Sequence, residues 1–146
     1  PAPVVEETAV VEPTPNGQLL LSAAGAEIHG EKLNTEDRDG QINLGFWDNA
    51  AEWVSWMMRV PKPGKYNVSA SIATVNEGAQ VFIQSGSATL SKTIESTGDW
   101  GNFKTFQLGQ LNISEPGGQL LSLRPKDPSS WKPINLRTIR LEPVTE

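Results

Sequence analysis

The stretch WVSWMMRVPKPGKYNVSASI, residues 53–72, decides the fold. In its first half, apolar side chains recur at every second position, which is typical of a strand with one buried face: Val54, Trp56, Met58 and Val60. A helical face is the competing interpretation, and it would use Ala50, Trp53, Val54 and Met57. We favour the strand because the turn PKPGK follows it and a second alternating run begins at Tyr66.

Outward from this hairpin, the chain repeats the same pattern of short alternating runs and turns. QLLLSAAGAEIHG (18–30) predicts a strand, a bend and a second strand, NTEDRDGQ (34–41) a charged turn, and INLGFW (42–47) a strand. Further strands are predicted at AQVFIQS, ATLSKTI, NFKTFQLG, GQLLSLRP and INLRTIRLEP. We therefore expect an all-β fold, a jelly-roll β-sandwich of about nine or ten short antiparallel strands. Strands do not alternate with helical patterns, which argues against a parallel α/β sheet.

Composition excludes several classes of function. The chain has 146 residues with 17 acidic and 12 basic side chains, a net charge of −5 that argues against a nucleic-acid partner. It has no cysteine, which excludes disulfides and thiolate metal sites. No apolar run approaches the roughly 20 residues that a membrane helix needs.

Two segments are distinguished by composition. Residues 1–16, PAPVVEETAVVEPTPN, are rich in Pro, Glu and Val, and we interpret them as a linker or tail. The alternative is an edge strand laid on the domain. Residues 17–146 form the predicted β-sandwich domain. A linker implies a neighbouring domain of the same polypeptide, which we expect as a partner.

Catalytic chemistry finds little support. His29 is the single histidine and lies outside any nucleophile motif, so we expect a structural or solvent-exposed role. Paired carboxylates could serve a glycosidase, and two clusters offer them: Glu36 with Asp37 and Asp39, and Asp48 with Glu52. Neither cluster lies in a recognisable motif, and charged turns are usually solvated. The acidic turn could instead hold calcium, although its spacing does not match an EF-hand loop.

Five tryptophans are the stronger signal. Trp56 shares the buried face of its predicted strand, whereas Trp53 on the other face is either core of a second layer or a surface platform. The remaining three, Trp47, Trp100 and Trp131, lie in turn-like contexts with polar neighbours. An indole ring can stack on the C–H face of a pyranose while nearby amides and carboxylates bind its hydroxyls. These three residues therefore indicate a sugar site, with capping of the sandwich end as the alternative for each one.

The order of motifs resembles the family 6-like carbohydrate-binding modules, which are galactose-binding-like β-sandwiches. The similar elements are WVSWMMRVPKPGKYNVSASIA (53–73), STGDWGNFKTFQLG (96–109), GGQLLSLRP (117–125) and INLRTIRLEP (134–143). The resemblance implies a non-catalytic domain that binds a glycan or polysaccharide, often as an accessory domain of a glycoside hydrolase.

The resemblance also implies a site in the loops at one end of the sandwich. Trp100 matches the tryptophan of the family's T-G-x-W loop, Phe46 or Trp47 the facing aromatic, and Asn135 the asparagine before the last strand. The polar, turn-forming context of the loops adds Trp131, and Asp99 as a polar contact. The family's first strand often has an Ala-Glu pair that helps bind a structural calcium. Ser22 lies in the corresponding stretch here, so we predict no metal.

We therefore expect a carbohydrate-binding module of a secreted or cell-envelope enzyme. The alternative is a structural β-sandwich that packs on a neighbouring domain through the same aromatic side chains. The two differ in whether Trp100 lies exposed in a cleft or is covered.

Overall fold

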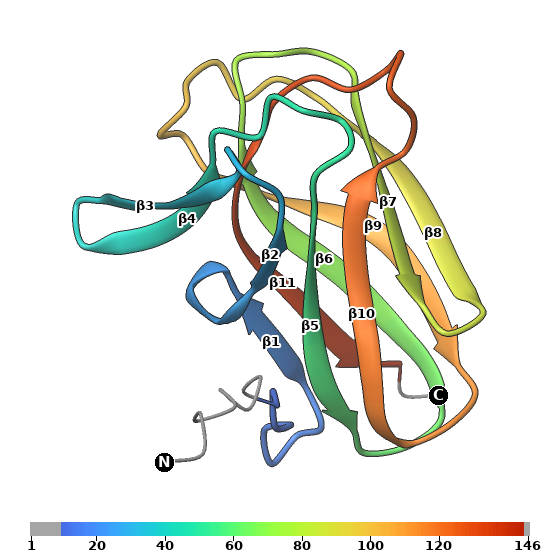
Figure 1. The fold of residues 1–146 in the computed structure, drawn as a ribbon. Helices are drawn as coiled ribbons and strands as arrows, with labels where there is room; N and C mark the ends of the chain where they lie inside the picture. The colour runs from blue at the N-terminus through green and yellow to red at the C-terminus, as the bar shows by residue number, and fades with distance from the viewer. Residues whose placement is uncertain (1–9, 145–146) are drawn as a thin grey trace, which may run out of the picture.

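The computed structural model describes residues 10–144, which form two antiparallel β-sheets packed face to face (Figure 1). This part of the chain contains eleven strands and a single 3-10 turn. Their bounds are β1 Leu19–Ser22, η1 Ala23–Gly25, β2 Glu27–His29, β3 Asn34–Arg38, β4 Gln41–Gly45, β5 Trp53–Val60, β6 Gly64–Ala73, β7 Ala79–Ser85, β8 Ala88–Ile94, β9 Lys104–Ile113, β10 Gly117–Pro125 and β11 Asn135–Pro143. The predicted all-β sandwich is confirmed.

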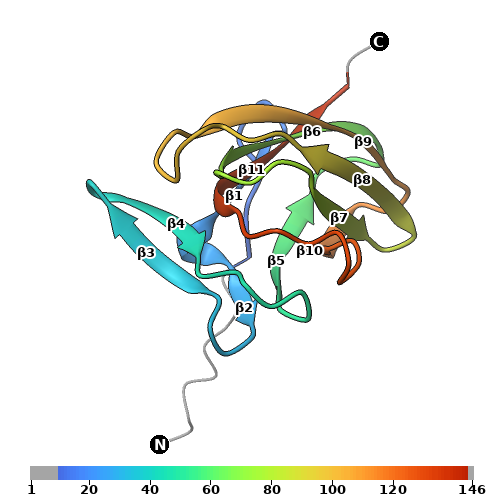
Figure 2. The ribbon, with the colours of Figure 1, turned by 90° about the horizontal axis from the view of Figure 1, so that it is seen from above.

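The two sheets have six and five strands (Figure 2). The larger has the order β3-β4-β11-β6-β9, with β1 also paired to β11, and the smaller has the order β2-β5-β10-β7-β8. Strand β4 meets β11 at a single register pair, Leu136 with Leu44. The β3–β4 hairpin consequently projects from the side of the sandwich, as Figures 1 and 2 show. This projection brings β3 to the end of the molecule where the long loops lie.

The core lies between the sheets, and the strands β5 and β6 supply much of it. The predicted inward residues of β5 are at most 1 % exposed: Val54, Trp56, Met58 and Val60. Those of β6 are at most 2 % exposed: Tyr66, Val68, Ala70 and Ile72. Strands β5 and β6 belong to different sheets. In each strand every second side chain is apolar and points inward, so the two apolar faces meet in one core between the sheets. The strand interpretation of residues 53–60 is confirmed.

The charged segment NTEDR is a strand, β3, and the prediction of a turn there was wrong. This strand was not among those predicted, and it pairs with β4 over five register positions. The turn is confined to Asp39 and Gly40, whose φ angles are +53° and +83°. Positive φ at both central residues is the type I′ hairpin geometry that Asp-Gly favours. The acidic side chains of this segment therefore alternate between two faces of a hairpin.

Val11 and Glu12 contact strand β5 of the smaller sheet. Val11 bridges to Met58 in parallel orientation, with hydrogen bonds of 2.8 Å from its amide to the Met57 carbonyl and from the Arg59 amide to its own carbonyl. Arg59 also pairs with Glu12 at 2.9 Å. This end of the predicted linker thus contacts the sandwich, whereas residues 1–9 lie outside the described residues. Within residues 10–144, there is no helix with the length and apolar character needed to span a bilayer.

A buried carboxylate fixes the β2–β3 loop. Glu52 is 6 % exposed, and its two oxygens accept hydrogen bonds from the consecutive backbone amides of Glu31, Lys32 and Leu33. A Cβ atom on Gly30 would overlap this carboxylate, so glycine is required for the close approach. Burial raises the pKa of Glu52, but the three backbone hydrogen bonds and the charge of Lys32 outweigh it and hold the pKa below its ordinary value.

We expect Glu52→Gln to lower the free energy of unfolding by about 1.5–3 kcal/mol at pH 7, because an amide cannot accept all three bonds. The pKa is depressed in the folded state, so the carboxylate stabilises fully above its ordinary value of 4.5 and the contribution is lost as the pH falls through the folded pKa. Urea unfolding of parent and variant from pH 7 to pH 3 measures this. The difference should shrink at the acidic end, and exposed Glu95→Gln is the control. A difference independent of pH would contradict the account.

Candidate functional site: a cleft at the loop end

A cleft of about 250 Å³ lies at the end of the sandwich where the β3–β4 hairpin meets the β4–β5, β8–β9 and β10–β11 loops. Its walls combine two aromatic rings, three charged side chains and the start of β11. The lining residues are Glu36, Arg38, Phe46, Asp48, Trp100, Pro133, Ile134 and Asn135. Three of the six side chains predicted from the sequence meet here, namely Trp100, Phe46 and Asn135.

The loop that holds Trp100 is fixed by its own hydrogen bonds. Thr97 is 6 % exposed and joins the loop to the end of β6, because its amide donates to the Thr74 carbonyl at 2.8 Å. Asn102 closes the turn from the other side, with its side-chain amide donating to the Thr97 carbonyl at 2.8 Å. Gly98 has a φ of +85°, which glycine adopts without strain. The loop thereby places Trp100 half-buried at the rim of the cleft.

The side chain of Asn135 holds the backbone of Trp100 in place. It lies at the first position of β11, is 4 % exposed, and donates from Nδ2 to the Trp100 carbonyl at 2.9 Å. The side chain thus ties the loop to the sheet. A Cβ atom on Gly45 would lie 3.1 Å from Asn135 Oδ1 and also 3.1 Å from Glu36 Oε1. Because Gly45 has no side chain, Asn135 and Glu36 can both reach the same small area of the cleft.

Glu36 provides an ionised carboxylate in the wall of the cleft. Its Oε1 accepts from Arg38 Nε at 2.8 Å and from Asn43 Nδ2 at 3.0 Å. Burial raises the pKa of Glu36, but the bond from Asn43 and the bond and charge of Arg38 together hold it below the ordinary value. The sequence pattern placed Glu36 in a solvated turn and did not point to Arg38 as a site residue. Their i, i+2 spacing on a strand, which places both on one face, was the available signal.

The aromatic neighbour of Trp100 in the cleft is Phe46, and the structure corrects the placement of Trp47. Trp47 is fully buried, and its Nε1 donates to the Glu52 carbonyl at 2.9 Å. Its ring is therefore unavailable for stacking on a ligand. Phe46 is 57 % exposed and has a φ of +59°. A positive φ is rare and strained for a bulky residue, and such strain gathers at functional sites.

Two further predicted residues lie outside the cleft. Trp131 is half-buried, tilted against Trp47 with ring centroids 5.1 Å apart, and donates from Nε1 to the Trp47 carbonyl at 2.8 Å. It lines a neighbouring hollow. Asp99 is exposed and accepts from the Gly101 amide at 3.1 Å, so its carboxylate stabilises the turn. The structure does not bring Asp99 into the lining of the cleft.

The predicted metal and catalytic alternatives concern the same carboxylates. Among residues 10–144, no group of three or more His, Asp or Glu side chains is arranged to hold a metal ion. Glu36 and Asp48 both line the cleft, which a glycosidase pair would require. A general acid, however, needs a raised pKa, and that of Glu36 is lowered. The Glu52 carboxylate accepts the backbone hydrogen bonds of the β2–β3 loop and does not line the cleft.

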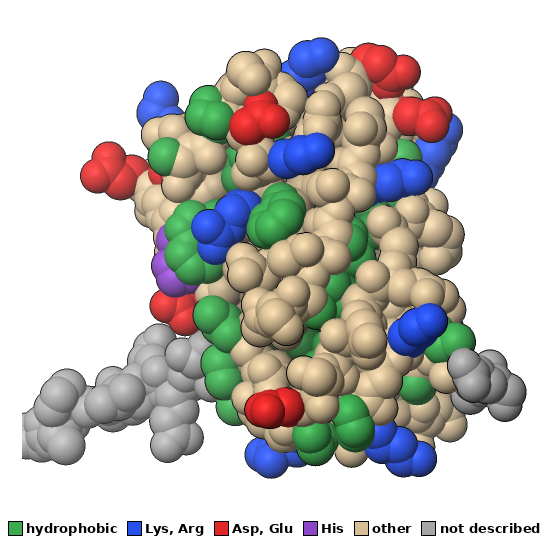
Figure 3. Space-filling view, turned by 90° about the vertical axis from the view of Figure 1, so that its right-hand side faces the viewer, with side chains coloured by type: hydrophobic (Ala, Val, Ile, Leu, Met, Phe, Trp, Pro, Cys, Tyr) green, Lys and Arg blue, Asp and Glu red, His purple; other side chains and the backbone are tan. Residues whose placement is uncertain are grey.

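Trp53 and His29 lie elsewhere, on the outer face of the smaller sheet. Their rings stack with centroids 3.8 Å apart, and the Arg124 guanidinium lies 4.8 Å from the Trp53 ring. His29 is hydrogen-bonded to Ser55 Oγ at 2.8 Å. Figure 3 shows a histidine beside hydrophobic and basic side chains at the edge of this view. Trp53 therefore lies on the surface and is not part of the core of a second layer. His29 and Arg124 lie against its ring.

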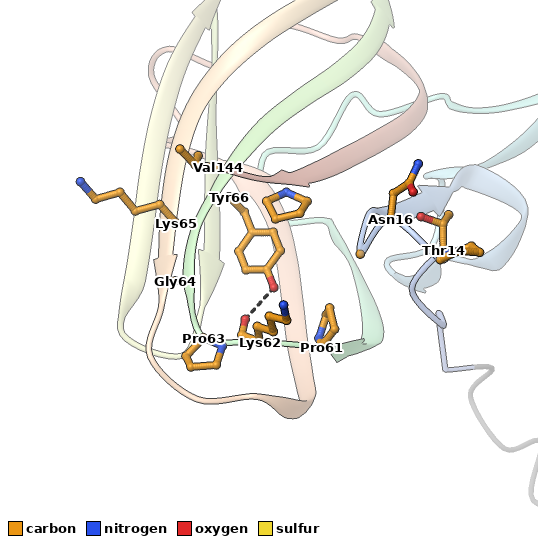
Figure 4. A pocket seen from close by; sticks show the side chains of 12 residues that line it. Thr14, Asn16, Pro61, Lys62, Pro63, Gly64, Lys65, Tyr66 and Val144 are labelled. Atoms are coloured by element: carbon orange, nitrogen blue, oxygen red, sulfur yellow. Dashed lines mark hydrogen bonds between the residues drawn. The ribbon is translucent and has the colours of Figure 1, made fainter. Parts of the chain in front are cut away.

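A separate hollow of about 390 Å³ lies at the opposite end of the sandwich, where the β5–β6 turn meets residues 14–17 and 143–144. Tyr66 stands at its centre and donates from its hydroxyl to the Lys62 carbonyl at 2.6 Å (Figure 4). None of the residues predicted for the site lies here.

The described residues form a β-sandwich with a cleft at its loop end, and comparison with known proteins gives the family. The family model of the carbohydrate-binding module family 35 matches residues 26–123, and the chain belongs to this family. Such modules bind carbohydrates and are a non-catalytic type of domain. The sequence resemblance to galactose-binding-like modules is confirmed.

One curated protein and two solved structures illustrate what the chain is similar to. The β-agarase AgaA of Microbulbifer thermotolerans is 27% identical over 112 residues, which are 74% of this chain and 25% of that protein. The chain therefore spans about a quarter of that enzyme's length. The C-terminal family 6 module of the laminarinase LamC from Zobellia galactanivorans has a TM-score of 0.72 at 21% identity, covering 86% of this chain and 98% of that one. A family 6 module of Cellvibrio mixtus lichenase 5A, solved with cellotriose, has a TM-score of 0.71 at 21% identity, covering 86% and 97%. These two structures share the fold of the present chain.

Proposed function

We propose that this domain binds a neutral polysaccharide in the loop-end cleft, as the accessory module of a secreted glycoside hydrolase. The observation that carries the proposal is the composition of the cleft. Trp100 and Phe46 line it together with Glu36, whose carboxylate is held ionised and oriented by Arg38 and Asn43. A cleft with aromatic rings beside a fixed hydrogen-bond acceptor suits a sugar, which presents C–H faces to rings and hydroxyls to acceptors.

The size and charge of the cleft narrow the ligand. About 250 Å³ is below the roughly 300–1,000 Å³ of pockets that enclose drug-sized molecules, so the cleft suits a single sugar ring. Glu36 and Asp48 are acceptors when ionised and would repel a uronate or sulfate group, although Arg38 offsets part of that charge. Uncharged sugars therefore fit best.

The similar proteins suggest which polymers to test. Agarose, laminarin and lichenan, embedded one at a time in native gels, would retard the migration of a domain that binds them. We expect retardation by at least one of these polymers and none by a sulfated or uronate polymer such as carrageenan or alginate. If every neutral polymer leaves the migration unchanged, the proposed function is wrong.

The role of Glu36 gives a separate prediction. We expect Glu36→Gln to weaken binding of the retained polysaccharide about tenfold or more, because a hydrogen bond to a charged acceptor contributes about 1.5–3 kcal/mol. The lowered pKa of Glu36 also predicts that the affinity of the parent stays constant as the pH falls from 7 to 5, since the carboxylate remains ionised. Isothermal titration calorimetry at both pH values measures this. Glu115→Gln, an exposed change in the distant β9–β10 turn, is the control.

Unchanged affinity in Glu36→Gln would show that the carboxylate does not contact the ligand. A loss of parent affinity between pH 7 and pH 5 would show that Glu36 does not act as a permanently ionised acceptor in this range.

A further inference from the structure

We propose that the cleft is the middle of a three-part groove, which binds consecutive sugar residues within a polysaccharide chain and not a chain end alone. This inference rests on the proposed function and names the form of the ligand. Two hollows adjoin the cleft at different residues, and each shares a charged side chain with it. We define them by those shared residues as the Asp48 hollow and the Arg38 hollow.

The Asp48 hollow has a volume of about 480 Å³ and is lined by Lys32, Asn49 and Trp131 among others. Trp131 is fixed in place, because its Nε1 bonds the Trp47 carbonyl and its ring rests against the buried Trp47 ring. A half-buried indole that needs no rearrangement loses little entropy when a ligand stacks on it. Trp131 is thus a second aromatic platform, separated from the cleft by Asp48.

The Arg38 hollow has a volume of about 490 Å³ and is lined by polar side chains, including Asp37, Gln41 and Arg137. Arg137 lies over the Phe103 ring, with its guanidinium carbon 3.8 Å from the ring centroid. Its Nε is buried and has no hydrogen-bond partner among the described residues. Gly101, which follows Trp100, also lines this hollow, and a Cβ there would lie 3.7 Å from Arg38 Nη1. The Arg38 guanidinium thus lies close to the Trp100 loop at the point where the hollow and the cleft adjoin.

The shared lining residues of the three spaces and the mixed charges of their walls favour one polysaccharide chain as the occupant. The central cleft alone is smaller than either neighbour, and the side chains of Asp48 and Arg38 border two spaces each. Both adjoining hollows contain charges of opposite sign, Lys32 with Asp48 in one and Arg137 with Asp37 in the other. Such mixed walls offer donors and acceptors without a net field, which suits the hydroxyls of an uncharged chain.

The test is the dependence of affinity on ligand length. The probes are the di-, tetra- and hexasaccharides of the agaro-, laminari- or cello-series, chosen to match the polymer in the gels that retards the domain. By calorimetry we expect the Kd of the parent to fall at least about tenfold from disaccharide to tetrasaccharide. Trp131→Ala should remove most of that gain while leaving the disaccharide Kd within about twofold of the parent.

Two exposed variants keep the test valid if Trp131→Ala is unstable. Lys32→Ala and Gln41→Ala lie in different hollows, and each should weaken the hexasaccharide but not the disaccharide. Trp53→Ala, on the outer sheet face, is the matched tryptophan control and should change neither. The inference is overturned if the disaccharide binds as tightly as the hexasaccharide, or if all variants weaken both ligands equally. Absence of binding to every series would instead refute the proposed function, and the inference with it.

Discussion

Trp100→Ala is expected to abolish retention by the polysaccharide, with affinity reduced at least about 30-fold. The truncation removes a half-buried ring from the wall of the cleft, and tryptophans that dominate binding sites typically contribute about 2 kcal/mol or more. Stability should change little, because the loop is held by Thr97 and Asn102 and not by the indole. Affinity gels and calorimetry measure binding, and thermal unfolding measures stability.

The control for Trp100 is Trp53→Ala, which removes an equally large and similarly half-buried ring from a sheet face outside the groove. It should bind as the parent does. Equal binding by folded Trp100→Ala and parent would show that the cleft is not the binding site, and loss of binding in both variants would indicate a nonspecific effect.

Trp47→Ala is expected to have the largest effect on stability, about 3–5 kcal/mol, as for other large core residues cut to alanine. The ring is fully buried, packs against Trp131 and bonds the Glu52 carbonyl, so its removal leaves a cavity and an unpaired acceptor. Domains of this size are stable by about 5–15 kcal/mol, so the variant should be marginal. Urea unfolding measures the loss.

The milder Trp47→Phe separates stability from binding. It keeps the backbone carbonyl to which Trp131 Nε1 donates, so the folded protein should bind the disaccharide within about threefold of the parent. A folded Trp47→Phe protein with an affinity about 30-fold weaker would restore Trp47 as a ligand residue.

The fold was predictable where burial enforces alternation. Val54 to Val60 and Tyr66 to Ile72 each have one face in the core, and there the period of two is clean. Strand β3 was missed because the segment NTEDR has no apolar face to bury and projects with β4 beyond the sandwich. Its register comes from the Asp39-Gly40 turn, a local signal that was present in the sequence.

The candidate site was predictable only in part. Glycines on both sides of Trp100 indicated an exposed loop, and the structure places that residue at the cleft. Phe46 and Trp47 could not be separated, because the positive φ of Phe46 at the end of β4 breaks the alternation that would decide which ring faces outward. Arg38 was missed together with β3, and Glu36 was considered only as a catalytic or calcium-binding carboxylate of a turn, since their common face exists only once that strand is recognised.

The central claim is that sugar binds beside Trp100, and the indole N–H signals of the five tryptophans test it most directly. An NMR titration of the 15N-labelled domain with the matching tetrasaccharide follows each signal, assigned by single Trp→Phe variants. The account predicts the largest shift for Trp100, a smaller one for Trp131, and little change for Trp47, Trp53 and Trp56. Saturable shifts confined to Trp53, with Trp100 unmoved, would contradict it and move the site to the outer face of the smaller sheet.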